Sequence, residues 1–271
     1  TVGGKMVFYP QIIDNTGATF KTSVTITGNN STEAQLLSAN STYTGVTTDE
    51  TNGSILTVYK LADGGLPSSL GAATAAAANL SFGSNNNGAL TLKYIGTGDS
   101  TNRAMTINTN SHYGAADTFI IDNEGTGALV MSGSPVAHLA TGWFDSVPAG
   151  IVLTGTTAAN LVNQYNGTVG DFNNPSPLGI TKNGAATWSL GNVANTFTGV
   201  TSVNAGILRA VKLSDGGVAS SIGQATNASA NLILNGGTLQ YTGSGDSTDR
   251  NFRLMSSSTI DSSGASPVIF S

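Results

Sequence analysis

The sequence predicts an all-β chain that folds as a right-handed parallel β-helix, a solenoid of stacked strands. Three observations lead to this prediction. Charged residues make up only 9% of the 271 residues, whereas an ordinary soluble domain has about 25%. Short apolar runs alternate with turns rich in Gly, Asn, Asp and Ser. Several segments recur in the same order along the chain, which is the sign of a repetitive architecture.

The composition favours strands and excludes several classes of function. Apolar residues make up 39% of the chain, and Val, Ile and Leu fall in short alternating runs. The net charge of −5 argues against a nucleic-acid partner, because phosphate binding needs clustered Lys and Arg. There are no cysteines, so disulfides and thiolate metal sites are excluded. No run approaches the roughly 18 apolar residues of a membrane span, so none is expected. Since the chain begins at Thr1, we expect a processed product or a section of a longer protein.

The apolar runs have the period of strands and not of helices. Each is bounded by residues that tolerate tight turns, and alternation places the apolar side chains on one face. Only residues 72–80 could form one or two helical turns. The runs include Ile55-Leu56-Thr57-Val58-Tyr59, Ala89-Leu90-Thr91-Leu92-Lys93-Tyr94, Thr118-Phe119-Ile120-Ile121, Ile207-Leu208-Arg209-Ala210 and Thr238-Leu239-Gln240-Tyr241.

Internal repetition is the strongest signal. Matched segments keep their order, while their separation shrinks in small steps, as a solenoid with variable loops allows. Equivalent strands should therefore place Leu92 and Tyr94 where the second unit has Leu239 and Tyr241. The matches are Thr42-Tyr43-Thr44-Gly45-Val46-Thr47 with Thr196-Phe197-Thr198-Gly199-Val200-Thr201, Leu61-Ala62-Asp63-Gly64-Gly65 with Leu213-Ser214-Asp215-Gly216-Gly217, Ser68-Ser69-Leu70-Gly71 with Ser220-Ser221-Ile222-Gly223, and Gly96-Thr97-Gly98-Asp99-Ser100-Thr101-Asn102-Arg103 with Gly243-Ser244-Gly245-Asp246-Ser247-Thr248-Asp249-Arg250.

These matches divide one continuous solenoid into units. Residues 40–194 form the first unit, with an irregular insertion at about 135–190, and residues 195–271 form a second, truncated unit. Residues 1–39 are expected to be the end of a preceding unit or the start of the β-helix, because Val24-Thr25-Ile26-Thr27-Gly28 is similar to Ile151-Val152-Leu153-Thr154-Gly155.

The repeated segments resemble the autotransporter-associated β-strand repeat. The resemblance rests on Thr196-Phe197-Thr198-Gly199-Val200-Thr201, Asn204-Ala205-Gly206-Ile207-Leu208 and Gly236-Gly237-Thr238-Leu239, with a looser copy over residues 42–58. It covers both units and is thin over residues 1–30 and 135–185. It implies a right-handed parallel β-helix in a large secreted or surface-displayed bacterial protein, and it implies no activity.

The octet Gly-x-Gly-Asp-Ser-Thr-x-Arg is the most conspicuous polar motif, and it has two interpretations. In the first, Asp99 and Asp246 are calcium ligands, since calcium takes carboxylate and carbonyl oxygens. In the second, which we favour, the octet is a turn in which the Gly pair adopts positive φ and the Arg pairs with the Asp four residues back. Calcium-binding β-rolls repeat their motif in tandem, whereas the octet occurs once in each unit.

Other candidate sites are weaker. His112 and His138 lack acidic neighbours at ligand spacing, although zinc needs three or four ligands. Trp143-Phe144 and Trp188 either form a sugar-stacking platform or, as we expect, pack in the irregular segment. Acidic residues are dispersed, whereas glycoside cleavage needs carboxylates about 5–10 Å apart. These acidic residues are Asp49, Glu50, Asp117, Asp122, Glu124, Asp145 and Asp171.

The sequence therefore predicts a non-enzymatic structural protein outside the cell or on its surface: a stalk, spacer or fibre subunit. We expect no catalytic, cofactor-binding or metal-binding residues. Open strand edges favour end-to-end self-association, and a surface glycan or a receptor on a host or other cell is the other partner to consider. The alternatives are a carbohydrate-binding or polysaccharide-cleaving β-helix, and an adhesin with a receptor site on the insertion at 135–190.

Overall fold

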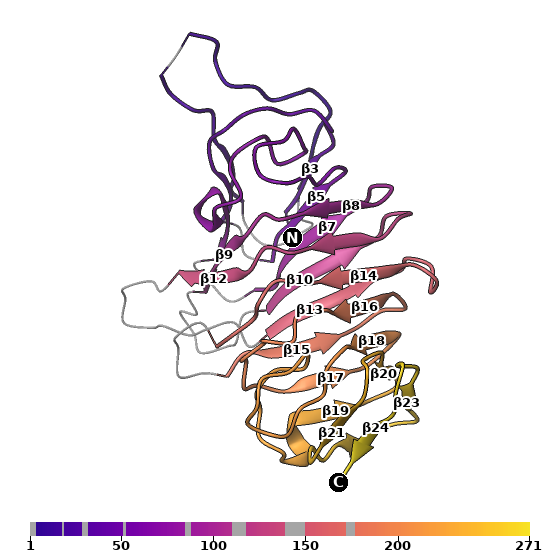
Figure 1. Ribbon diagram of the computed structural model, residues 1–271. Helices are drawn as coiled ribbons and strands as arrows, with labels where there is room; N and C mark the ends of the chain where they lie inside the picture. The colour runs from indigo at the N-terminus through magenta and orange to yellow at the C-terminus, as the bar shows by residue number, and fades with distance from the viewer. Residues whose placement is uncertain are drawn as a thin grey trace. The chain divides into compact units, whose positions relative to one another are not determined.

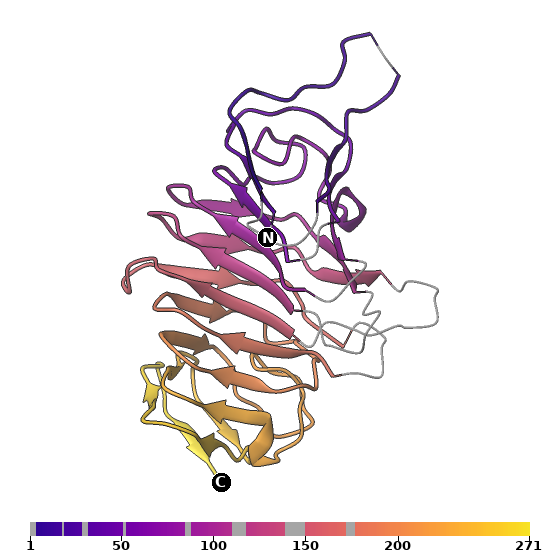
Figure 2. The same cartoon turned by 180° about the vertical axis from the view of Figure 1, so that it is seen from behind.

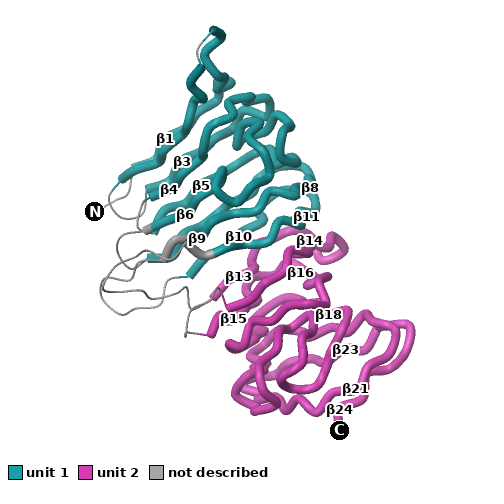
Figure 3. The backbone as a smooth tube through the Cα atoms, turned by 60° about the vertical axis from the view of Figure 1, so that its left-hand side comes forward, with its two compact units in different colours: residues 1–148 teal, residues 149–271 magenta. Residues whose placement is uncertain are grey.

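The computed structural model describes residues 4–17, 19–28, 32–50, 53–84, 88–109, 118–138, 150–171 and 177–271. The chain divides into two compact units, residues 1–148 and 149–271 (Figure 3). Across the described ranges the structure consists of short strands and two one-turn 3-10 helices, η1 (Ala77–Asn79) and η2 (Ser229–Asn231). Helix η1 lies within residues 72–80, the stretch that was expected to form a helical turn. Helix η2 lies in the matching segment of the second repeat.

Unit 1 is a stack of strands that returns repeatedly to the same three sheets (Figure 1). One sheet has the order β1-β3-β5-β7-β10, a second the order β2-β4-β6-β9-β12, and the third pairs β8 with β11. The strands are β1 (Lys5–Phe8), β2 (Val24–Ile26), β3 (Glu33–Leu36), β4 (Thr47–Asp49), β5 (Ile55–Val58), β6 (Leu80–Ser84), β7 (Leu90–Tyr94), β8 (Asp99–Thr101), β9 (Met105–Thr109), β10 (Thr118–Asn123), β11 (Leu129–Met131) and β12 (Pro135–His138).

Unit 2 is built in the same way (Figure 2). Its sheets have the orders β14-β16-β18-β20-β23 and β13-β15-β17-β19-β22, and β21 pairs with β24. The strands are β13 (Gly150–Gly155), β14 (Val162–Tyr165), β15 (Gly179–Lys182), β16 (Thr187–Leu190), β17 (Thr201–Val203), β18 (Ile207–Ala210), β19 (Leu232–Leu234), β20 (Thr238–Tyr241), β21 (Asp246–Thr248), β22 (Arg253–Leu254), β23 (Thr259–Ser262) and β24 (Val268–Phe270).

The strand pairs are parallel and in register, so identical positions stack along the sheet. In unit 1, Leu56 pairs with Leu92, which pairs with Ile121. In unit 2, Leu208 pairs with Leu239, which pairs with Ile260. Tyr94 and Tyr241 end the corresponding strands β7 and β20, so the predicted equivalence of these positions is confirmed. The prediction of an all-β parallel β-helix is also confirmed.

The pairing pattern of unit 1 recurs strand by strand in unit 2. Strands β1 to β11 correspond in order to β14 to β24, and among these strands each corresponding pair has the same neighbours within its own unit. We refer to residues 5–131 as copy 1 and to residues 162–270 as copy 2. The duplication thus reaches further back along the chain than the segments matched by sequence. Lys5–Phe8 (β1) takes the place of Val162–Tyr165 (β14), although the two share no residue.

The core is a set of inward-facing columns filled by Leu, Ile, Val, Phe and Tyr. Alternation buries every second residue, as in β10 (Thr118–Asn123) and β13 (Gly150–Gly155). A fully buried Leu or Ile contributes about 1.5–3 kcal/mol, and in a stacked column each side chain also covers the one below it.

The segment at 135–190 differs from the expectation of an irregular insertion. Where the structure describes it, it carries β12 to β16, and β13 pairs in parallel with β15 as β14 does with β16. Its buried and exposed positions alternate only over short runs, such as Gly179-Ile180-Thr181-Lys182 in β15. A buried Lys at an inward position makes such a run look polar in sequence.

Candidate functional site

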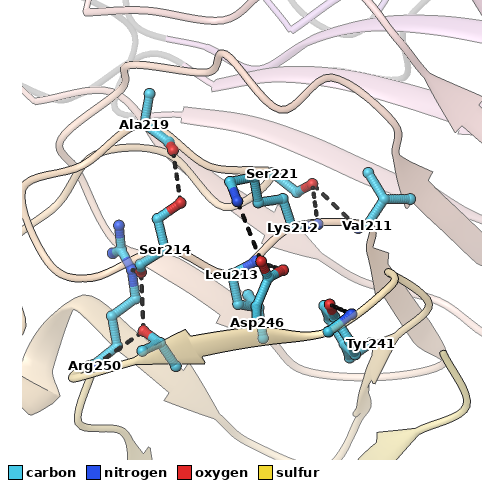
Figure 4. A network of polar contacts seen from close by, with 11 residues as sticks. Val211, Lys212, Leu213, Ser214, Ala219, Ser221, Tyr241, Asp246 and Arg250 are labelled. Carbon is cyan, nitrogen blue, oxygen red and sulfur yellow. Dashed lines mark hydrogen bonds and ion pairs between the residues drawn. The ribbon is translucent and has the colours of Figure 1, made fainter. Parts of the chain in front are cut away.

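The most elaborate polar arrangement occurs twice, once in each copy. Between β5 and η1 in copy 1, and between β18 and η2 in copy 2, the chain leaves the stack in an excursion loop, residues 60–76 and 212–228. Each loop is fastened to the octet that follows the next strand of the same sheet, β7 in copy 1 and β20 in copy 2. We call the fastening residues Tyr94, Asp99 and Arg103 together with residues 60–71 clasp 1. Clasp 2 is Tyr241, Asp246 and Arg250 with residues 212–223 (Figure 4).

The aspartate of each octet holds the start of the loop. Asp246 pairs with the Lys212 ammonium at 3.2 Å, and its second oxygen accepts the backbone N–H of Leu213 at 3.0 Å. In clasp 1, Asp99 pairs with Lys60 and accepts the Leu61 amide at 3.0 Å. The partner of each aspartate is therefore a Lys that lies more than thirty positions earlier in the chain.

The arginine of each octet holds the rest of the loop through backbone carbonyls. Arg103 is 3% exposed, and its guanidinium donates to the carbonyl oxygens of Ala62, Leu66 and Gly71. Arg250 is 5% exposed and donates to five carbonyls, at distances of 2.8–3.4 Å; these belong to Ser214, Asp215, Val218, Gly223 and Ala225. The expected pairing of each Arg with the Asp four residues back is therefore wrong. A planar fork with five donors suits a ring of carbonyls that a curved loop presents on its inner side.

Hydroxyl and amide groups complete the clasp. The Ser221 hydroxyl accepts the amides of Val211 and Lys212 at 3.1 Å each, and Ser69 does the same in clasp 1. At the loop tip, Asp215 accepts the Asp249 amide at 3.0 Å, while the Asp249 side chain accepts the Gly216 amide at 2.7 Å. Such reciprocal bonds satisfy backbone groups that have no ladder partner.

One glycine in each loop is required by both conformation and space. Gly71 and Gly223 have positive φ values of 69° and 82°. A Cβ on Gly223 would lie 2.4 Å from the carbonyl oxygen of Phe197 and 2.7 Å from its ring. Gly71 meets Tyr43 in the same way. The prediction that each octet is a turn holds only for its first residues, since the chain bends at the Gly pair and then continues as strand β8 or β21. Only the second glycine of each pair, Gly98 or Gly245, has positive φ.

Burial and hydrogen bonding set the charge states in the clasp. Burial opposes ionisation of Asp246, but hydrogen bonds from the Leu213 amide, Tyr241 and Lys212 hold the pKa of Asp246 below its usual range. Burial raises the pKa of the Tyr94 hydroxyl, and its hydrogen bond to Asp99 raises it further. Burial also lowers the pKa of Arg103 and Arg250, yet an Arg stays protonated at any physiological pH. The clasps are thus fixed networks of charged donors and acceptors.

A groove of about 530 Å³ lies beside clasp 1. Its walls mix the Lys60–Asp99 ion pair with apolar side chains, of which Leu66 is largely exposed. The lining residues are Lys60, Leu61, Ala62, Asp63, Leu66, Pro67, Gly98, Asp99 and Ser100.

The predicted candidates for metal binding and sugar stacking are placed as follows. The octet aspartates bind Lys and backbone amides, and within the described ranges no three His, Asp or Glu side chains gather as a metal would need. His138 ends β12, and His112 lies outside the described residues. Trp188 is fully buried in β16, and its indole N–H donates to the Thr154 carbonyl at 2.9 Å. It therefore packs, as expected, and forms no sugar platform. Trp143 and Phe144 lie outside the described residues.

The acidic residues that a lyase or glycosidase would use are mostly occupied elsewhere. Asp171 caps a turn by accepting the amides of Leu178 and Thr198, and Asp49 is buried and accepts the Ser54 hydroxyl. Asp122 is the exception. Burial and the neighbouring Glu124 raise the pKa of Asp122, and Lys93 lies 3.7 Å away. Asp117 and Asp145 lie outside the described residues, and Glu50 is exposed.

Two structural residues were missed at the level of sequence. Asp14 receives the amides of Thr22 and Thr44, the same role that Asp171 has in copy 2. Lys182 is buried, and its ammonium donates to the carbonyls of Asn183, Gly184 and Ala205 at 2.5–3.1 Å. Burial lowers the pKa of Lys182 to about 8.

These features define the class of the molecule: a repetitive parallel β-helix whose few charged groups fasten its own loops. Residues 180–210, which run from β15 to β18, match the family described as the passenger-associated-transport-repeat. Over 270 residues, or 95% of its length, the chain is 37% identical to the adhesin BmaC autotransporter of Brucella suis biovar 1 (strain 1330). The chain spans 7% of that relative. No solved structure matches it.

The chain is therefore an autotransporter-associated repeat protein, as its repeated segments predict. The expected location outside the cell or at its surface is confirmed, and the chain has the role of a passenger segment there. In the portion of the chain that the structure covers, no helix has the length and apolar character needed to cross a membrane.

Proposed function

We propose that this chain is a non-enzymatic spacer of a surface passenger, a stalk or fibre segment that holds other parts away from the cell. One observation carries the proposal: the polar groups of the two clasps are consumed by the loops that they fasten. The Arg250 guanidinium donates to five backbone carbonyls. The Asp246 carboxylate pairs with the Lys212 ammonium and accepts the Leu213 amide. Such saturation suits mechanical persistence, because most of these carbonyls accept a second donor as well, so the loss of one contact leaves the others in place.

The repeat boundaries belong to this proposal. We keep a division into residues 1–39, 40–194 and 195–271 as the sequence repeat. The strand correspondence supports a structural repeat that starts near residue 5 and again near residue 162. In a spacer the residue at which a repeat begins is unimportant, because every turn of the β-helix stacks on its neighbours in the same way.

The test of the proposal is an assay for cleavage of acidic and neutral polysaccharides by the purified chain. We expect no turnover. Asp122 and Glu124, with Lys93 beside them, are the group that most resembles a lyase centre. Cleavage that is lost in Asp122→Asn or Glu124→Gln, and kept in Asp171→Asn, would overturn the non-enzymatic proposal and favour the polysaccharide-cleaving alternative.

A second candidate function is adhesion, favoured by the description of the BmaC relative as an adhesin. The receptor would be a surface glycan or a protein of a host or other cell, bound at the segment 135–190 or at the groove beside clasp 1. Binding of the labelled chain to cultured cells and to a glycan array tests this candidate. Saturable binding that unlabelled chain competes away would support it, and its absence on both would remove it.

A further inference from the structure

The groove beside clasp 1 has an open edge strand as one of its walls. Strand β8 is the last of its sheet and, among the strands that the structure describes, pairs with β11 alone. The Asp99 amide and the Thr101 carbonyl bond to residues at the two ends of β11. Successive residues of a parallel strand direct their backbone groups to opposite sides. The N–H and C=O of Ser100 therefore point away from β11, and Ser100 lines the groove.

The excursion loop lies along this edge without satisfying it. The Asp99 carboxylate accepts the Leu61 amide, and the Thr101 hydroxyl donates to the Ala62 carbonyl at 2.9 Å. Because side chains bridge the loop to β8, the two backbones form no ladder. Within the described ranges, no residue hydrogen-bonds the N–H or the C=O of Ser100. A strand edge with an unpaired donor and acceptor recruits the main chain of another segment.

The opposite wall of the groove supplies aliphatic surface. Leu66 is 54% exposed, and the neighbouring Pro67 is exposed as well. The Lys60 ammonium is already paired with Asp99. None of the residues that line the groove is aromatic, so the groove has no ring on which a sugar could stack. A main-chain donor and acceptor beside aliphatic side chains suit a polypeptide better than a glycan.

Copy 2 repeats this arrangement of loop and strand. Strand β21 pairs with β24 alone among the described strands, and Ser247 takes the place of Ser100. The Thr248 hydroxyl donates to the Ser214 carbonyl at 2.9 Å, so a side chain again bridges the strand to the loop. Val218 at the loop tip is 52% exposed. The open edge beside an aliphatic loop tip is thus a feature of the repeat and not of one loop.

We propose that the groove beside clasp 1 binds an extended peptide segment of a partner protein. The main chain of the peptide pairs with the N–H and C=O of Ser100, and an aliphatic side chain of the peptide packs against Leu66 and Pro67. In strand addition of this kind, main-chain hydrogen bonds provide affinity and the contacts of the side chains provide specificity. This inference rests on the adhesion candidate above, because it states where a receptor is held and that the receptor is a polypeptide.

The test measures binding of the labelled full chain to an array of short peptides and to a glycan array. Peptides that bind are then titrated with variants by fluorescence anisotropy. Ser100→Pro removes the open N–H and should weaken binding at least about 10-fold. Ser100→Ala keeps both backbone groups and should bind like wild type. Leu66→Ser should weaken binding about 5-fold, whereas Val193→Ser, at an exposed aliphatic position of unit 2, is the matched control and should not.

Methylation of the peptide's backbone nitrogens, one at a time, identifies the main-chain contact. It should abolish binding at the residue whose N–H pairs with the Ser100 carbonyl. Circular dichroism checks that each variant folds, and the methylation series on the wild-type chain decides if Ser100→Pro does not. Binding to glycans alone, or peptide binding that Ser100→Pro leaves unchanged or that Ser100→Ala lowers equally, would overturn the proposal. Saturable adhesion to cells alongside such a result would leave the adhesion candidate intact, whereas a chain that binds neither cells nor glycans removes that candidate whatever the peptides show.

Discussion

Replacing the clasp arginines by methionine should destabilise the two copies unequally. Arg103→Met removes three hydrogen bonds and Arg250→Met removes five, although most of the carbonyls keep a second donor, as Gly71 does from Ser68 and Gly223 from Ser220. A hydrogen bond within a protein contributes about 0.5–1.5 kcal/mol net. At about 1 kcal/mol for each bond, the expected losses in free energy of unfolding are about 3 kcal/mol for Arg103→Met and about 5 kcal/mol for Arg250→Met.

The net value for each hydrogen bond is appropriate because methionine keeps most of the apolar stem and the carbonyls keep other donors. Arg209→Met is the matched control. Arg209 lies in β18 of copy 2, and its guanidinium contacts the Gln240 side chain on the outer face of the sheet. Surface contacts of this kind contribute about 0–1 kcal/mol, so this variant should unfold nearly as wild type does.

Hydrogen exchange read by mass spectrometry measures the effect separately in each copy. Arg103→Met should speed exchange over residues 60–76, and Arg250→Met over residues 212–228, with the larger change in the second case. Because a solenoid is stabilised by neighbour contacts, each variant should leave the other loop almost unchanged. If Arg250→Met costs no more than Arg209→Met, the carbonyl contacts do not stabilise the loop and the clasp interpretation fails.

Two further predictions concern glycine and pH. Gly223→Ala should destabilise copy 2 by at least about 2 kcal/mol more than Gly217→Ala. Both glycines have a φ near 80°, but only Gly223 has Phe197 in contact. Equal losses of free energy in urea unfolding would show that the backbone conformation alone matters. Lys182 has a folded pKa of about 8 against 10.5 for the free group, so the unfolded state binds more protons in this range. Wild-type stability should therefore rise from pH 8 to pH 10 relative to Lys182→Met, by less than about 3 kcal/mol; a flat difference between the two denaturation series would contradict this.

The stacking of strands could be predicted from the sequence, but the length of chain that the duplication covers could not. Identical short segments marked the region after residue 40, because loops and turns need particular residues such as Gly71 and Gly223. Strands only need alternation, so Lys5-Met6-Val7-Phe8 and Val162-Asn163-Gln164-Tyr165 occupy corresponding places without any identity. A comparison of residues would therefore miss the first part of the duplication, whereas a comparison of inward and outward positions could have found it.

The partners within the clasps could be predicted only in part. An Asp and an Arg four residues apart suggest an ion pair, but in a strand of a solenoid the closest groups belong to the previous turn, 27 to 39 positions earlier in these contacts. One signal was present in the chain. Lys60 and Lys212 both stand directly before the repeated Leu-x-Asp-Gly-Gly segment, and they are the residues that Asp99 and Asp246 bind. A repeated Lys beside a repeated loop, in a chain with so few charges, points to such a contact.

The chain has few charged residues, and two of them keep the excursion loops in shape outside the core. An excursion loop has backbone groups that no ladder satisfies, and a chain without cysteines cannot fasten it with a disulfide. Arg103 and Arg250 solve this by binding carbonyls, whose positions depend on the backbone and not on the side chains of the loop. The loop side chains are therefore free to vary: Leu66 at one tip corresponds to Val218 at the other, and both are exposed. A repeated array built this way can change what its loops display while every turn of its β-helix stays the same.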